Sequence, residues 1–270
     1  MSGIELLSGR RCAQGQIRAA VFDFDGTLST LRHGWETVMR GLMLEFIGQG
    51  EAGLALEKEV DDYIDQSSGI QTVYQMQWLA DRVRTAGRAA EGRDLWWYKD
   101  EYNRRLMEKI ASRIREVTVH PEKREEYTVK GSAAFLTALR DKGVELFLAS
   151  GTDHEDVMKE AGALELADSF TLIKGAPSRQ MACSKEKVIR LILEEKRLEP
   201  ESLLIVGDGK VEISLGASCG AFTLGVASNE DTRQGINEVK RARLVKAGAD
   251  VLAGDFEDCA GLLRALGLTA

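Results

Sequence analysis

Three short apolar runs stand out along the chain, and each of them ends in small or acidic residues. They cover residues 19–22, 144–149 and 203–206. Uninterrupted apolar runs of this length are typical of strands that are buried on both faces of a parallel sheet. Segments with helical spacing lie between the runs, so strand and helix alternate. The pattern predicts an α/β fold in which a parallel sheet carries its functional site at the carboxyl ends of the strands.

Residues 30–130 interrupt this alternation because they have the pattern of helices almost throughout. We expect helices at about residues 33–48, 51–66, 70–87 and 94–117. The third of these has apolar residues at helical spacing, namely Val73, Met76, Ala80 and Val83. On this pattern alone, the segment is a helical unit that packs around a core of its own.

Two aspartates follow the first apolar run directly. Asp23 and Asp25 are two residues apart, so in extended backbone both side chains point to the same side, while Phe22 and Phe24 point into the core. Two carboxylates this close repel each other unless a cation lies between them, and Mg²⁺ prefers oxygen ligands of this kind. A hairpin turn at Asp25 and Gly26 is the alternative, but no second alternating strand follows. We therefore expect a phosphate-transfer site here.

The second run ends in residues that suit an anion. Ser150, Gly151 and Thr152 follow residues 144–149 and offer small hydroxyls and backbone N–H groups. Thr152 and Glu155 form a capping-box pattern, which predicts that a helix begins there with its N-terminus toward the ligand. Taken alone, a capped helix after a strand is commonplace and is more often structural.

The third run ends in a Gly-Asp-Gly sequence at residues 207–209, and Glu212 follows. Asp208 thus places a further carboxylate at the end of a predicted strand. An isolated Gly-Asp-Gly sequence is more often a turn. This motif therefore gains its weight from its position after the other two.

Lys185 lies between the second and third runs. It belongs to a predicted helix whose apolar face includes Val188, Leu191 and Ile192. A single lysine on a helix is usually solvated, and Lys174 and Lys187 are alternatives. Only its position relative to the other motifs favours Lys185 as a functional residue.

Taken in this order, the residues resemble the four motifs of the haloacid dehalogenase-like hydrolase superfamily. Asp-Phe-Asp-Gly-Thr begins at Asp23, Ser-Gly ends the second run, Lys185 follows, and Gly-Asp-Gly-x-x-Glu contains Asp208. The interval of 23 residues between Lys185 and Asp208 is similar to that of phosphoserine-phosphatase-like members. The resemblance covers residues 17–29 and 131–227. Glu212 stands where many members carry Asp.

The resemblance implies a Rossmann-like parallel sheet core with an inserted, mostly helical cap domain. The core would consist of residues 1–29 and 131–270, and the cap of residues 30–130. A cap inserted at this place looks like a mobile lid, which excludes water from the catalytic crevice and contributes contacts to the substrate.

The resemblance also implies a Mg²⁺-dependent phosphatase that hydrolyses a small phosphorylated metabolite through an aspartyl-phosphate. Asp23 would be the nucleophile, and Asp25 the general acid and base. Ser150, the N–H of Gly151 and Lys185 would bind the phosphoryl oxygens. The Mg²⁺ ligands would come from four acidic residues, which are Asp23, Asp25 through its backbone carbonyl, Asp208 and Glu212.

Substrate contacts are expected from residues that follow the first motif. Arg32 and His33 are close enough in sequence to border the crevice. Arg32 is equally suited to pairing with a surface acid, and His33 to flanking a helix. The polar turn at residues 67–69, with Gln71 and Thr72, is a further candidate.

Three other functions stay open on the sequence. A sugar-phosphate mutase of the same superfamily would return the phosphoryl group to the substrate instead of to water, and product analysis with hexose phosphates separates the two. A dehalogenase is disfavoured because such members lack the second acid of the first motif, here Asp25. A non-catalytic phosphometabolite-binding protein is disfavoured by the complete set of Asp23, Asp25, Lys185 and Asp208.

The composition supports a soluble enzyme in the reduced cytoplasm. The 270 residues carry a formal net charge of −7, and Lys and Arg form no cluster, which argues against nucleic acid as a partner. No apolar run is long enough for a membrane span. The cysteines are widely separated and predict neither a zinc site nor a disulfide framework; they are Cys12, Cys183, Cys219 and Cys259. We expect a monomer or homodimer, and residues 1–16 contain either an extra edge strand or a tethered tail.

Overall fold

The computed structural model describes residues 3–48, 53–181 and 184–269. A seven-stranded sheet lies at the centre of this part of the chain, with the order β1-β7-β6-β5-β2-β3-β4. The strands are β1 (Ile4–Leu6), β2 (Ala19–Phe22), β3 (Glu145–Asp153), β4 (Leu172–Ala176), β5 (Leu203–Gly207), β6 (Phe222–Val226) and β7 (Val251–Ala253). β1 runs antiparallel to β7, and the other neighbouring pairs are parallel. The predicted α/β fold with a parallel sheet core is confirmed, and β1 is the edge strand considered for residues 1–16.

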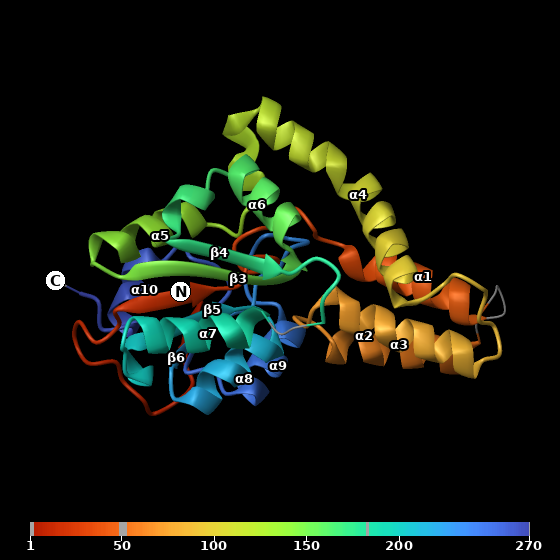
Figure 1. The fold of residues 1–270 in the computed structure, drawn as a ribbon. Helices are drawn as coiled ribbons and strands as arrows, with labels where there is room; N and C mark the ends of the chain where they lie inside the picture. The colour runs from red at the N-terminus through yellow and green to blue at the C-terminus, as the bar shows by residue number, and fades with distance from the viewer. Residues whose placement is uncertain (1–2, 49–52, 182–183, 270) are drawn as a thin grey trace.

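Helices cover both faces of the sheet (Figure 1). One face carries α5 (Ser132–Asp141), α6 (His154–Ala163) and α10 (Cys259–Ala265), and the other carries α7 (Ser184–Glu195), α8 (Lys210–Cys219) and α9 (Glu238–Ala247). Successive residues of β2 point to opposite faces, so Phe22 packs in the cluster that contains α5, while Val21 packs in the cluster that contains α7. Burial on both faces explains why these strands lack polar positions.

Four α-helices of the described chain separate β2 from α5. They are α1 (Trp35–Gly48), α2 (Leu54–Gln66), α3 (Thr72–Thr85) and α4 (Leu95–Val119). They lie beyond the carboxyl ends of the strands, and α4 runs back toward α6 (Figure 1). Their bounds lie within a few residues of the predicted ones, although residues 51–52 of the second predicted helix lie outside the described ranges. On α3 the inward positions Val73, Met76 and Val83 are buried.

The chain leaves the sheet and returns to it at neighbouring positions. Ser29 forms an antiparallel bridge with Thr128. The backbone N–H of Thr30 donates to the carbonyl of Tyr127, and the N–H of Val129 donates to that of Leu28. Both connections to α1–α4 therefore pass through one short paired ribbon, which begins where the 3₁₀ helix η1 (Pro121–Tyr127) ends.

Two local predictions are wrong. β3 continues to Asp153 and α6 begins at His154, so Thr152 does not cap a helix; its hydroxyl donates instead to the carboxylate of Asp25. On α7, Leu191 is exposed and Ile189 is buried in its place. The reason is the helical period: Ile189 and Ile192, four and seven positions after Lys185, lie on the same side of α7 as Lys185. Leu191, six positions after it, lies on another side.

No helix within the described ranges combines the length and the hydropathy that crossing a membrane would require. Cys12, Cys219 and Cys259 are free thiols. Cys183 lies outside the described residues.

Candidate active site

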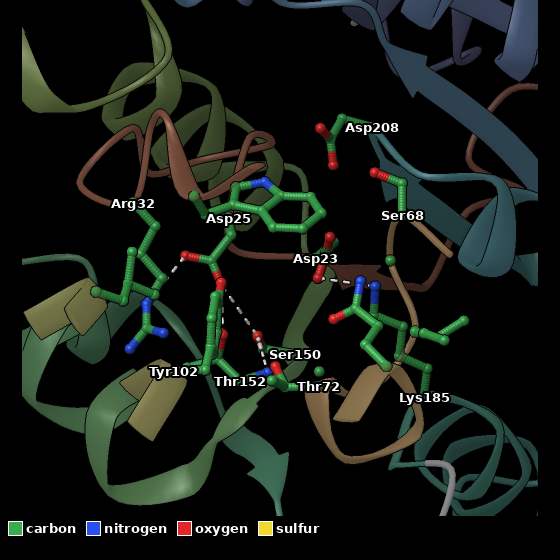
Figure 2. Close-up of a pocket in the computed structure, with 16 residues that line it drawn as sticks. Asp23, Asp25, Arg32, Ser68, Thr72, Tyr102, Ser150, Thr152, Lys185 and Asp208 are labelled. Atoms are coloured by element: carbon green, nitrogen blue, oxygen red, sulfur yellow. Dashed lines mark hydrogen bonds and ion pairs between the residues drawn. The ribbon is translucent and has the colours of Figure 1, made fainter. Parts of the chain in front are cut away.

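A pocket lies where the ends of β2, β3 and β5 meet helices α1–α4 (Figure 2). Its floor consists of Asp23, Asp25, Ser150, Gly151, Thr152 and Asp208 from the strand ends, with Lys185 from α7. The register explains this convergence, because Phe22 pairs with Leu148 on β3 and with Val206 on β5. The residues that follow all three strands therefore reach the same edge of the sheet.

Lys185 forms an ion-pair centre beside Asp23. Its Nζ lies 3.0 Å from Asp23 Oδ1 and 2.9 Å from Glu212 Oε2, and all three side chains are buried. Burial disfavours the charged ammonium, but the two carboxylates outweigh this effect and raise the pKa of Lys185. Lys185 is therefore a permanent positive charge next to Asp23, whereas Lys174 and Lys187 are exposed and do not line the pocket.

Glu212 is held in place through both of its carboxylate oxygens. The backbone N–H of Gly209 donates to Oε1 at 2.6 Å, and Lys185 donates to Oε2. Burial opposes ionisation, but Lys185 and the backbone N–H groups outweigh it, so the pKa of Glu212 lies below its ordinary value. A Cβ atom on Gly207 would lie 2.2 Å from Cγ of Glu212, which means that only glycine permits this close packing.

Asp208 extends into the pocket from the end of β5, and Lys240 on α9 is its partner. Lys240 Nζ lies 2.8 Å from Asp208 Oδ2 and 2.6 Å from Glu230 Oε1. Burial raises the pKa of Asp208, Lys240 opposes this, and the nearby acids add to the increase. Gly26 has a φ of +75°, and a Cβ atom there would lie 2.3 Å from Asp208 Oδ2. Asp208 thus lies so close to the backbone of the first motif that only glycine fits at position 26.

Three carboxylates in the pocket form a site that a cation can share. One oxygen each from Asp23, Asp208 and Glu212 lie within 4.8 Å of one another. Burial raises the pKa of Asp23 well above its ordinary value, Lys185 opposes this, and the neighbouring acids add to it. A hard divalent cation such as Mg²⁺ fits this donor set, because its charge would offset the repulsion among the acids. Glu212 is the least available of the three, since both of its oxygens already accept hydrogen bonds.

Asp25 lines the same pocket, and its two carboxylate oxygens have different surroundings. Thr152 Oγ1 donates to Asp25 Oδ2 at 2.8 Å, and the hydroxyl of Ser150 lies 3.5 Å from the same oxygen. Oδ1 is buried and accepts no hydrogen bond from any described residue. The nearest cationic group to it is Nε of Arg32, at 3.8 Å. Thr152 on one side and Arg32 on the other therefore fix the carboxyl group of Asp25 at the pocket.

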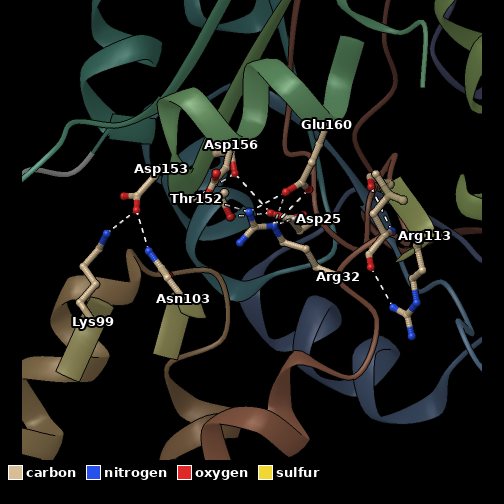
Figure 3. Close-up of polar contacts among 12 residues, drawn as sticks. Asp25, Arg32, Lys99, Asn103, Arg113, Thr152, Asp153, Asp156 and Glu160 are labelled. Atoms are coloured by element: carbon tan, nitrogen blue, oxygen red, sulfur yellow. Dashed lines mark hydrogen bonds and ion pairs between the residues drawn. The ribbon is translucent and has the colours of Figure 1, made fainter. Parts of the chain in front are cut away.

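Arg32 lines the pocket but is bound to acids of α6 (Figure 3). Its Nε lies 3.1 Å from both oxygens of Glu160, and its Nη2 lies 2.6 Å from Glu160 Oε1 and 3.2 Å from Asp156 Oδ2. The side chain of Glu160 is 1% exposed, and burial raises its pKa to about 7 although Arg32 opposes the change. The main partner of Arg32 is thus the buried Glu160, with the partly exposed Asp156 beside it, and not the surface acid considered from the sequence.

The walls of the pocket come from α1–α4. They consist of Trp35, Ser68, Gly69, Ile70, Thr72, Gln75, Tyr102 and Leu106. The loop between α2 and α3 comes close to the end of β3, because a Cβ atom on Gly151 would lie 3.0 Å from the carbonyl oxygen of Ile70. On the other side, Lys99 and Asn103 of α4 donate hydrogen bonds to Asp153 (Figure 3). These contacts leave a cavity of about 90 Å³.

Most candidate residues from the sequence meet at this pocket, and His33 does not. The pocket contains Asp23, Asp25, Arg32, Ser150, Gly151, Lys185 and Asp208, with Glu212 directly behind Lys185. His33 lies against two acids instead, with Nδ1 3.5 Å from Glu230 Oε2 and Nε2 3.1 Å from Asp231 Oδ1. The predicted substrate contact of His33 therefore finds no support in the geometry.

Besides the wall residues Ile70, Gln75, Tyr102 and Leu106, three residues that contact the charged groups of the site were not identified from the sequence. Thr152 was assigned to a helix cap, and Lys240 carries no local signal because its role depends on how α9 packs. Glu160 does carry a signal in the sequence. It lies between the buried residues Val157 and Ala161 of α6, and an acid on the inward side of a helix needs a charged partner.

Comparisons with known proteins agree with this geometry. A family model described as a haloacid dehalogenase-like hydrolase matches residues 17–220, whereas a comparison with curated proteins finds no match. Among solved structures, a predicted phosphoglycolate phosphatase from Haemophilus somnus is 17% identical with a TM-score of 0.64, covering 92% of this chain and 98% of that chain. A phosphonoacetaldehyde hydrolase like protein from Oleispira antarctica is 14% identical with a TM-score of 0.62, covering 97% of each chain. A β-phosphoglucomutase from Clostridium difficile is 16% identical with a TM-score of 0.58, covering 86% of this chain and 96% of that chain. At these identities the likeness to solved structures concerns the fold.

Proposed function

The chain belongs to the haloacid dehalogenase-like hydrolase family, and we propose that it is a Mg²⁺-dependent phosphatase that hydrolyses a small phosphorylated metabolite. One observation carries the proposal. Asp23 and Asp25 face one pocket, and the buried ammonium of Lys185 lies 3.0 Å from Asp23. This arrangement combines a nucleophile, an acid and a fixed positive charge around one point.

Asp23 acts as the nucleophile in this proposal. Its carboxylate oxygen attacks phosphorus and the bond to the leaving oxygen breaks, which gives an aspartyl-phosphate. Lys185 orients the carboxylate through Oδ1 and offsets negative charge as the phosphoryl group approaches. Water then attacks the phosphorus, releases phosphate and restores Asp23.

Asp25 moves the protons of both steps. It donates a proton to the leaving oxygen in the first step and takes one from the attacking water in the second. The hydrogen bond from Thr152 to Oδ2 holds the carboxyl group of Asp25 at the pocket. Thr152 is therefore a positioning residue for Asp25.

The rest of the floor binds the phosphoryl oxygens and the cation. Ser150, the N–H of Gly151 and Lys185 would bind the oxygens, while Asp23, the backbone carbonyl of Asp25 and Asp208 would hold Mg²⁺, with Glu212 behind them. A bound Mg²⁺ would supply positive charge that stabilises the transition state. We further propose that residues 30–130 form a cap over a core of residues 1–29 and 131–270, since α1–α4 supply the walls of the pocket.

The test measures phosphate release from acetyl phosphate, which is small and activated. Asp23→Asn should lower kcat by about 10³-fold or more, because an amide cannot form the phosphoenzyme. Asp231→Asn is the matched control, since the side chain of Asp231 is 80% exposed and lies outside the pocket lining. Excess chelator should abolish turnover. Full activity in chelator, or near-normal activity of Asp23→Asn, would reject the proposal.

A further inference from the structure

Among the described residues of 30–130 that line the pocket, Arg32 alone is charged, and three acids already share its guanidinium. We propose that the natural substrate is the phosphate monoester of a small, uncharged alcohol, whose leaving group bears hydroxyl or carbonyl oxygens but no carboxylate and no second phosphate. This inference rests on the proposed phosphatase function, to which it adds the class of leaving group.

Three cations beside the acids of the pocket, Lys185, Lys240 and Arg32, are already paired with buried or partly buried acids. Lys185 contacts Asp23 and Glu212, and Lys240 contacts Asp208 and Glu230. Arg32 is shared by Glu160, Asp156 and Asp25. Each cation thus faces two or three carboxylates, and the floor has a surplus of negative charge among the described residues. A divalent cation would reduce this surplus enough for one phosphoryl group, but a second anion would be buried without a counter-charge.

The polar groups of the walls are neutral hydroxyls. Figure 2 shows Ser68, Thr72 and Tyr102 around the space in front of Asp23 and Asp25. None of the three hydroxyls forms a hydrogen bond with another described residue. Burial raises the pKa of Tyr102, so its phenol stays protonated. A hydroxyl can donate to or accept from a substrate hydroxyl or carbonyl, whereas a carboxylate would gain no ion pair here.

The size of the cavity limits the leaving group further. Its volume is about 90 Å³, so a compact alcohol fits beside the phosphoryl group while α1–α4 lie as they do here. Trp35, Ile70 and Leu106 supply apolar surface for its carbon atoms.

The same reasoning separates a phosphatase from a sugar-phosphate mutase. A mutase that returns the phosphoryl group to a sugar phosphate must hold a bisphosphate, and the second phosphate would lie against the walls. Apart from Arg32, which is already shared by three acids, the described residues of 30–130 that line the pocket offer no cation to bind it. The charge distribution therefore favours transfer to water from a singly phosphorylated substrate.

The experiment compares two esters that differ at one carbon, 2-hydroxyethyl phosphate and 2-phosphoglycolate, with the Mg²⁺-loaded full chain. We expect kcat/KM to be about 10- to 100-fold higher for the hydroxyethyl ester, because the carboxylate of the other is buried without a partner. Equal or faster turnover of 2-phosphoglycolate would overturn the inference.

A pair of variants at one wall position separates charge from size. Thr72→Lys places a cation in the wall, and Thr72→Met places a side chain of similar length without charge. The Lys variant should shift the ratio of the two kcat/KM values about tenfold toward 2-phosphoglycolate, and the Met variant should not. A ratio that is unchanged in the Lys variant, or that shifts equally in both variants, would contradict the charge argument.

Acetyl phosphate distinguishes failure of the inference from failure of the proposed function. If the protein hydrolyses acetyl phosphate but does not hydrolyse 2-hydroxyethyl phosphate, the inferred leaving group is wrong and the phosphatase stands. If none of the three compounds is hydrolysed in the presence of Mg²⁺, the proposed function fails, and the inference fails with it.

Discussion

Replacing Arg32 with methionine tests whether the acids beside the pocket depend on this one cation. In Arg32→Met the side chain keeps most of its length but loses the guanidinium. Glu160, whose side chain is 1% exposed, then loses three contacts of 2.6–3.1 Å. Removing one partner of a buried ion pair costs about 3–5 kcal/mol, and Asp156 adds little because it is partly exposed. We therefore expect a loss of about 3–5 kcal/mol in the free energy of unfolding at pH 8.

The matched control is Arg190→Met on α7. Arg190 pairs with Glu186 at 3.0 Å, and both side chains are more than half exposed, so the expected cost is only about 0–1 kcal/mol. The measurement is urea unfolding followed by circular dichroism and by tryptophan emission, and coincident transitions justify a two-state treatment.

The pH dependence gives the Arg32 variant a second signature. Burial raises the pKa of Glu160 above its ordinary value of 4.5, so in the variant it is the ionised form that destabilises the fold. The penalty is largest above the raised pKa and shrinks as the pH falls toward 4.5, because the carboxyl group can then take up a proton. The cost of Arg32→Met should therefore be smaller at pH 5.5 than at pH 8.

Combining Arg32→Met with Glu160→Leu should recover much of the lost stability, since an apolar pair leaves no buried charge. The reasoning is refuted if Arg32→Met costs less than about 1 kcal/mol, the range of an exposed pair. A cost that does not change between pH 5.5 and pH 8 would refute it equally.

Two further predictions concern the first motif and its surroundings. Gly26→Ala adds a Cβ atom 2.3 Å from Asp208 Oδ2 at a φ of +75°, so Asp208 must move. We expect a rise in the Mg²⁺ concentration needed for half-maximal activity and about a 10²-fold loss of kcat. An unchanged Mg²⁺ titration would contradict this. The hydrogen bond with Glu230 raises the pKa of His33, so its contribution to stability is complete below pH 6.5 and disappears as the pH rises through the raised value. His33→Gln should thus destabilise the protein at pH 6 but have little effect at pH 9 in urea unfolding, and an equal effect at both would show that the ion pair contributes nothing.

The sequence predicts those parts of the site that depend on strand ends. Asp23, Ser150 and Asp208 each follow a buried apolar run, and the parallel sheet brings the ends of such runs to one edge. The order of the motifs singled out Lys185, and its Nζ lies 3.0 Å from Asp23 Oδ1 in the structure. The sequence could bring these residues to one pocket because that requires only the direction of the strands.

The residues that were missed or misplaced depend on packing between distant segments. The local sequence at Thr152 matches a helix-capping pattern. In the folded chain, however, the hydroxyl of Thr152 donates its hydrogen bond to the carboxylate of Asp25, which is distant in sequence, and not to a backbone group of the helix. Lys240 reaches Asp208 only because α9 packs beside α8 at the edge of the pocket. His33 adjoins Arg32 in sequence, but neighbours in a tight turn point in different directions, so adjacency did not place it in the pocket.

The paired ribbon that joins the sheet to α1–α4 makes this segment a replaceable module. Ser29 bridges Thr128, so the segment between them begins and ends at almost the same place, as a hairpin loop does. A different set of helices grafted at this junction would inherit the same anchoring points without altering the register of any strand. Under the proposed function, the groups of the floor that act on phosphorus and the groups of the walls that contact the leaving group would therefore change independently. A lineage that keeps this junction can acquire new substrates by exchanging the module while the hydrolytic chemistry stays the same.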